Sequence, residues 1–207
     1  MHISEGVLSA PVLVAGGVLA AGGVGLGLRR MTPDKIPAVA LLSSTFFVAS
    51  LIHVPLGPAS VHLVLNGLTG LVLGWMAFPA LLVGLALQAV LFQFGGLTTL
   101  GVNTCIMAAP AVAVSYLFQP FAGSLNRILV FVSGALCGAL ALLTSSVLIA
   151  LCLVFTGRHF LEVAQLTVAA HVPIMVIEGM LSGFTVLFLR KVKPEILGAA
   201  ADVISPA

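Results

Sequence analysis

The first two residues of the chain, Met1 and His2, carry the groups most suited to chemistry. A histidine at the second position lets the terminal amine, the backbone nitrogen and the imidazole bind one metal through two fused chelate rings. A second imidazole would complete a plane of four nitrogens, a donor set that suits Ni(II) or Cu(II). Such a site weakens in acid because its donors must lose protons to bind. It also requires Met1 to be retained with a free amine; otherwise His2 is simply a polar residue at an exposed end.

The second imidazole has two main candidates, His53 and His62. Both are expected near the outer ends of helical spans, where a histidine can also simply be exposed to water without binding a metal. His171 and Glu178 form a further candidate pair, because seven residues are two helical turns and place both on one face. Ionisable groups at membrane depth are functional candidates, although a structural polar network would explain this pair equally well.

The composition defines the surroundings of these residues. Of 207 residues, 60% are hydrophobic and 7% are charged, whereas an ordinary globular domain has about 25% charged residues. A net charge of +2 excludes a nucleic-acid binder that works through a broad basic field, and the hydrophobicity excludes a disordered chain. The chain is therefore predicted to be an integral membrane protein. Its cysteines lie in apolar stretches and are expected to be small buried hydrophobes: Cys105, Cys137 and Cys152.

The apolar runs are continuous rather than alternating, which favours helices over a barrel. Charges and turn residues divide the chain into seven predicted spans. Three lie at about 7–28, 36–52 and 61–74; a turn marked by Trp75 and Pro79 leads into the fourth, which ends near Phe92; the last three lie at about 104–118, 128–155 and 167–189. Several of these are shorter than the roughly 20 residues that cross a bilayer. The prediction is an all-α integral membrane protein, a seven-transmembrane-helix bundle forming one domain over 1–207. Within it, 1–6 would be a metal-chelating segment, about 7–189 the bundle and 190–207 a tail.

The basic residues predict the orientation, because they are enriched in cytoplasmic loops. With the N-terminus outside and the C-terminus cytoplasmic, only Arg158 falls on the outer side. The other seven basic residues then lie on the cytoplasmic side: Arg29, Arg30, Lys35, Arg127, Arg190, Lys191 and Lys193. No basic region precedes the first apolar run, so we expect no cleavable signal peptide. Met1 would then lie on the outer face.

Four segments together resemble one family. They are the opening 1–6 (MHISEG), 60–62 (SVH), 88–103 (QAVLFQFGGLTTLGVN), and 169–171 (AAH) with Glu178-Gly179. They are similar to segments of the CbiM/NikM family, the substrate-capturing membrane subunits of energy-coupling-factor transporters for cobalt and nickel. The sequence departs from the family pattern at Val102, where alanine is usual, and over 104–107, which is more apolar. These departures leave the binding chemistry intact but could alter the wall of the pocket.

The resemblance implies a seven-helix bundle whose N-terminal segment occupies an outer pocket and holds Ni²⁺ or Co²⁺ there. It implies that the metal ligands are Met1, His2 and His62, and it provides no counterpart for His53. Glu5, Ser60 and Asn103 become candidates for orienting the imidazoles or fixing the N-terminal segment. The two metals use the same nitrogen donors, so the choice between them stays open.

The resemblance also implies partners in a bacterial or archaeal cell membrane. The chain has no Walker-type phosphate loop, so ATP hydrolysis is expected from ATP-binding cassette ATPases acting through a transmembrane coupling subunit, often with a small accessory membrane subunit. The chain itself is expected to be no enzyme, to have no cofactor of its own and to bind no nucleic acid. The alternatives are an intramembrane metal-dependent enzyme or a metal carrier or channel that is not coupled to ATP. No Gly-x-Ser-x-Gly or His-Glu-x-x-His pattern supports an enzyme, and the polar candidates gather on one predicted face rather than along a track.

Overall fold

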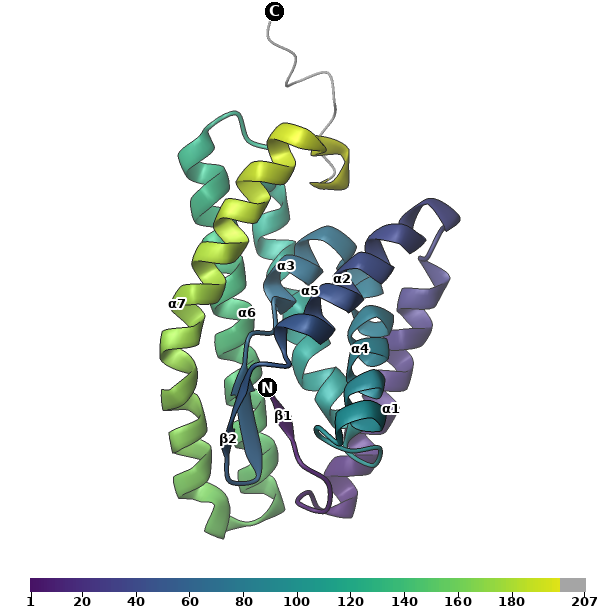
Figure 1. Ribbon diagram of the computed structural model, residues 1–207, viewed down its shortest axis with the longest axis vertical. Coiled ribbons are helices and arrows are strands. Elements are labelled where there is room, and N and C mark those ends of the chain that lie inside the picture. The colour runs from purple at the N-terminus through teal and green to yellow at the C-terminus, as the bar shows by residue number, and fades with distance from the viewer. Residues whose placement is uncertain (198–207) are drawn as a thin grey trace, which may run out of the picture.

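The computed structural model describes residues 1–197 and shows a bundle of helices with a small sheet inside it (Figure 1). The described residues form seven α-helices, three strands and four short 3₁₀ turns. The helices are α1 (Ala10–Arg29), α2 (Ile36–Ala49), α3 (Asn66–Leu73), α4 (Ala77–Phe92), α5 (Leu100–Ala122), α6 (Arg127–Thr156) and α7 (Leu161–Val192). The 3₁₀ turns are Pro33–Lys35, Gly74–Met76, Arg158–Phe160 and Pro194–Leu197.

Five helical stretches of the described chain are long and apolar enough to cross a membrane: 10–29, 66–92, 100–122, 127–156 and 158–192. The predicted membrane helical bundle is therefore confirmed. The predicted second span is shorter than expected, because α2 has only 14 residues. The predicted third and fourth spans lie in one stretch, where the turn Gly74–Met76 joins α3 to α4. The number of spans and the orientation of the two ends stay predictions.

Small residues allow the long helices to pack closely, as is usual in lipid. Along the α6–α7 pair, a Cβ added at Gly138 would lie 2.5 Å from the Ser182 hydroxyl, and one at Gly134 would lie 3.1 Å from the Cα of Gly183. In α1, the face carrying Gly23 packs on the ring of Phe78. These contacts leave no room for larger side chains, so they fix how near the helices approach.

A three-stranded antiparallel sheet, which the sequence did not predict, lies within the otherwise helical bundle. Its strands are β1 (His2–Ile3), β2 (His53–Leu56) and β3 (Ala59–His62), in the order β1-β3-β2. The predicted helix from Val61 is wrong, since α3 begins only at Asn66. The predicted span up to Ile52 also ends early, at Ala49. The reason is the two-residue loop Gly57-Pro58, whose glycine has φ +58. This loop turns the chain into a hairpin.

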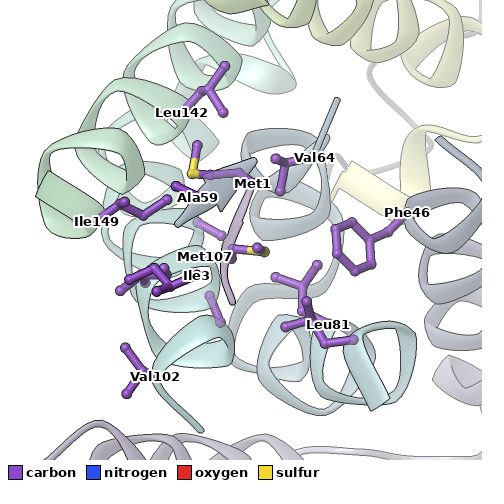
Figure 2. Close-up of a cluster of buried hydrophobic side chains, with 14 of the residues drawn as sticks. Met1, Ile3, Phe46, Ala59, Val64, Leu81, Val102, Met107, Leu142 and Ile149 are labelled. Carbon is purple, nitrogen blue, oxygen red and sulfur yellow. The ribbon is translucent and has the colours of Figure 1, made fainter. Parts of the chain in front are cut away.

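The N-terminus lies inside the molecule, beside the hairpin and close to the middle of the bundle (Figure 1). The side chains of Met1 and Ile3 are fully buried. Figure 2 shows them among apolar side chains from several helices, including Met107, Leu142 and Ile149. The first residues therefore form part of the hydrophobic core instead of an exposed end.

Three further boundaries differ from the predictions. The helix α5 starts at Leu100 and ends at Ala122, so Asn103 lies in its first turn and not at the end of a loop. Residues 190–192 of the predicted tail belong to α7, and 194–197 form a turn; the rest of that tail, 198–207, lies outside the described residues.

The cysteines were predicted to be buried. Cys137 is buried, whereas Cys105 and Cys152 are only half-buried.

Candidate metal-binding site

One face of the sheet gathers the candidate ligands. His2 is opposite Ser60 on β3, and His53 on β2 is opposite His62. Directly opposed residues of antiparallel strands share a face, and alternate residues of a strand share a face as well. All four side chains therefore lie on the same face, while Ile3 points to the other one and enters the core.

The imidazoles of His2 and His62 meet on this face. His2 Nδ1 lies 3.2 Å from His62 Nε2, and both side chains are buried. His62 Nδ1 lies 2.7 Å from the carbonyl oxygen of Leu63. A carbonyl only accepts hydrogen bonds, so His62 carries its hydrogen on Nδ1 and presents a lone pair at Nε2. His2 Nδ1 consequently donates to that lone pair.

The other nitrogen of His2 contacts Ser60. The distance from His2 Nε2 to the Ser60 hydroxyl is 3.1 Å, and in the metal-free tautomer the hydroxyl donates. If His2 Nδ1 gives up its hydrogen, two lone pairs face the same point. Two nitrogen ligands about 2.0 Å from one metal, at adjacent corners of a square, lie about 2.8 Å apart. The observed 3.2 Å is close to this spacing.

Burial keeps both imidazoles neutral. Burial and, to a smaller extent, the nearby His53 together lower the pKa of His2 to about 4. Burial also lowers the pKa of His62 to about 4, against the hydrogen bond to Leu63 that raises it and with a smaller lowering from His171. Metals bind the neutral imidazole. Both rings are therefore uncharged near neutral pH, so neither has to lose a positive charge before it binds a metal ion.

Side chains alone do not complete a metal site in this part of the chain. Within residues 1–197, no group of three or more His, Cys, Asp or Glu side chains could hold a metal ion. Two imidazoles converge instead, and one of them belongs to the residue directly after Met1. Further donors at this point would have to come from the amine of Met1 and the backbone nitrogen of His2.

Asn103 fixes the free edge of β1. Its Oδ1 accepts a hydrogen bond of 2.9 Å from the Ile3 N–H, and its Nδ2 donates 3.1 Å to the Ile3 carbonyl. The same amide group donates to the Thr99 hydroxyl at 3.1 Å. The side chain thus pairs with β1 as a neighbouring strand would. Thr99 was not among the predicted site residues, although it stands within the segment 88–103 that carries the resemblance.

Glu5 holds the N-terminal segment against the glycine loop that precedes α5. Its N–H donates to the Gly95 carbonyl at 2.7 Å. Its Oε1 accepts from the Thr98 N–H at 3.2 Å, and bonding to Thr98 lowers the pKa of Glu5. Gly96 has φ +148, and a Cβ there would lie 1.7 Å from Glu5 Oε2. Only glycine fits at this position, which explains the two adjacent glycines of the loop.

His53 and Phe94 form the wall of the site. The ring centroid of His53 lies 6.4 Å from that of His2, and its ring meets the Phe94 ring at a centroid distance of 4.1 Å, edge to face. Phe94 also stacks on His2, with centroids 6.0 Å apart. The resemblance gave His53 no role, yet the structure places it next to the two converging imidazoles. Sequence reasoning missed Phe94, for which its position directly before Gly95 was the available signal.

His171 and Glu178 are both buried on α7, as their spacing on one helical face predicts. Their side chains form hydrogen bonds with different backbone groups. His171 Nδ1 donates to the carbonyl of Thr167 at 2.6 Å. Glu178 Oε1 accepts from the backbone N–H groups of Val64 and Leu65, the latter at 2.8 Å. The structure therefore shows no hydrogen bond between the two among the described residues.

The chain is similar to known proteins over nearly its whole length. Residues 2–196 match the family model CbiM, described as "Cobalt uptake substrate-specific transmembrane region". A protein of Haemophilus influenzae, whose name assigns it provisionally to metal transport, is 43% identical over 95% of this chain and 97% of its own length. The "Cobalt transport protein CbiM" of Kyrpidia tusciae is 31% identical over 98% of this chain and 88% of its own length. A crystal structure of a transition metal transporter has a TM-score of 0.76 and 22% identity, covering 99% of this chain and all of that one; it shows the fold alone.

Two longer relatives contain a similar region as part of a fused chain. One, from Archaeoglobus fulgidus, is named as a fused nickel transport protein NikMN and is 25% identical over 95% of this chain and 68% of its own length. The other, from Methanocorpusculum labreanum, is named as a fused cobalt transport protein CbiMQ and is 26% identical over 99% of this chain and 37% of its own length.

Proposed function

The chain belongs to the CbiM family of multi-pass membrane proteins, and on this premise we propose that it captures Ni²⁺ or Co²⁺ at the outer face of the cell membrane for ATP-driven uptake. The observation that carries the proposal is the buried contact of 3.2 Å between His2 Nδ1 and His62 Nε2. Capture at the outer face follows from the basic residues, of which the predicted orientation puts seven of eight on the cytoplasmic side.

The proposed donor set has four nitrogens. They are the amine of Met1, the backbone nitrogen of His2, His2 Nδ1 and His62 Nε2. The first three belong to two consecutive residues and close two fused rings on the metal. Such a set suits tetragonal coordination, for which affinity rises from cobalt to nickel to copper.

Protons must leave as the metal enters. The Met1 amine and the His2 backbone nitrogen each lose one, and the hydrogen between the two imidazoles is displaced from His2 Nδ1. His2 Nε2 then carries the ring hydrogen and donates it to Ser60, whose hydroxyl can accept as readily as it donates. Ser60 therefore supports both tautomers of His2, and Asn103 with Glu5 holds the segment that brings the donors together.

The chain is proposed to work with other subunits. A transmembrane coupling subunit and ATP-binding cassette ATPases would supply the energy, and a small accessory membrane subunit would assist. The fused relatives support the first of these partners, because their longer chains combine a similar region with further transporter segments. Co-purification of the coupling subunit with a tagged form of this chain tests the association, and its failure in the presence of all subunits would contradict it.

The N-terminal amine provides the sharpest test of capture. We expect acetylation of the Met1 amine to weaken Ni²⁺ binding on the order of 100-fold or more, since the ring between the amine and the His2 backbone nitrogen loses its outer donor. The measurement is a titration of purified protein in detergent with a competing chelator, followed by absorption. The same protein with an unmodified Met1 amine is the matched control and should keep its full affinity. Equal affinities for the acetylated and the unmodified protein would show that the amine is no ligand.

A further inference from the structure

The segment that follows His62 is held in an unusual backbone conformation. Leu65, directly before α3, has φ +55, in the left-handed region. A residue with a Cβ rarely adopts this conformation because the Cβ crowds the following carbonyl, so neighbouring groups must hold it. Leu65 also precedes α3 without any side-chain cap of its own. The turn between β3 and α3 therefore depends on a partner from elsewhere.

Glu178 of α7 is that partner. One carboxylate oxygen, Oε1, accepts from both Val64 N–H and Leu65 N–H. The bonds join residues 114 and 113 positions apart in sequence. The Glu178 side chain is fully buried, and its Oε2 has no hydrogen-bond partner among the described residues.

This turn begins one residue after His62. The Leu63 carbonyl, which sets the His62 tautomer, lies between the histidine and the two N–H groups that Glu178 holds. A change in the turn would therefore rotate that carbonyl and turn His62 Nε2 away from His2. The helix that carries Glu178 has Pro173 in its interior, five residues earlier. Proline removes a backbone hydrogen bond and is a common position for a bend.

We propose that Glu178 is a positioning residue for His62, holding the Val64–Leu65 turn so that His62 Nε2 faces His2 and the bound metal is retained. A displacement of α7 would break both bonds and speed metal release. This inference rests on the proposed function, because it concerns the same pair of imidazoles. It assigns α7 the role of linking the metal site to the rest of the bundle.

The test is a double-mutant cycle measured on the full chain with Ni²⁺. We expect Glu178→Ala to raise the Ni²⁺ dissociation rate about 10–100-fold, the range typical of groups that orient metal ligands. Its absorption spectrum at saturating Ni²⁺ should move toward that of His62→Ala. In the His62→Ala background, which retains three nitrogen donors, the further change Glu178→Ala should have little effect on the rate. Glu178→Gln keeps an oxygen for the two N–H groups and should restore part of the retention.

The matched control is Ser182→Ala, one helical turn further along α7, where the side chain is also buried and packs near Gly138. It should leave both the rate and the spectrum unchanged. An equal effect of Glu178→Ala in both backgrounds, or an unchanged dissociation rate, would overturn the proposal. Failure of the proposed function is seen separately: in that case Ni²⁺ binding would be insensitive to His2→Ala as well, whatever happens at Glu178.

Discussion

Buried histidines occur in two regions of this bundle, and they differ in what their nitrogens face. In the sheet, His2 Nδ1 and His62 Nε2 face one another at 3.2 Å. In α7, His171 Nδ1 is already bonded to the Thr167 carbonyl of its own helix. Both regions exclude water, so burial does not distinguish them. What distinguishes the sheet is convergence, because two strands bring two nitrogens to one point, whereas one helix provides a single ring.

The largest effect should come from comparing the two regions directly. His2→Ala removes the imidazole that closes the second chelate ring, and we expect Ni²⁺ affinity to fall on the order of 1,000-fold. His171→Ala should leave the affinity within a factor of about 3, because that ring is bonded to its own backbone. Chelator competition on both purified variants measures the difference. Comparable losses would show that convergence in the sheet is not what makes the site.

A smaller effect sharpens the comparison within the sheet. His62→Ala leaves three donors on the first two residues, so we expect a loss on the order of 100-fold and a shifted absorption spectrum. His53→Ala should largely spare binding, since His53 Nδ1 faces the Leu51 carbonyl at 3.4 Å and its ring packs on Phe94. Titration followed by absorption compares the two variants. If His53→Ala were the weaker binder, the assignment of the second imidazole would have to change.

The smallest effect concerns stability without metal. The pKa values of His2 and His62 are lowered to about 4 in the folded protein, against about 6.5 for an unperturbed histidine. Between these values the unfolded chain binds more protons than the folded one, so stability is complete above about pH 6.5 and falls as the pH drops toward about 4. Thermal unfolding in detergent over this range should show the decrease.

The control for this pH effect is His62→Gln, which keeps a polar side chain but does not titrate. Its stability should fall less steeply between about pH 6.5 and about pH 4 than that of the unchanged protein. The same slope in both proteins would mean that His62 is not kept neutral by its surroundings.

Part of this structure could be predicted from the residues themselves. The scarcity of charge and the continuous apolar runs predicted the membrane helices. A helix in lipid satisfies its own backbone groups and needs apolar side chains along one contiguous stretch, so both signals are local in the sequence. The donors of Met1 and His2 are adjacent along the chain, so their chelating geometry needs no fold. The resemblance selected His62 over His53 and added Ser60 and Asn103, and the structure brings these near His2 or the strand that carries it.

The hairpin was missed because its local signals are weak beside a long apolar run. Val61 and the residues after Leu63 continue the hydrophobic pattern of α3, which predicted a helix from position 61. The two-residue loop at Gly57-Pro58 outweighed that pattern, since pairing along β2 and β3 satisfies the backbone groups that a helix would otherwise satisfy. For the same reason His53 was predicted at a helix end, and its pairing opposite His62 in the sheet was not predicted.

The sequence alone determined that the protein lies in a membrane and that its first two residues can chelate a metal. Both follow from composition or from adjacent atoms. Only the tertiary structure showed which atoms of distant residues lie within hydrogen-bond distance of these segments. Asn103 reaches Ile3 across 100 positions, and Glu178 reaches Val64 across 114. Such contacts depend on how strands pair and helices pack, and neither hydrophobic periodicity nor local spacing encodes which buried polar group will meet which backbone.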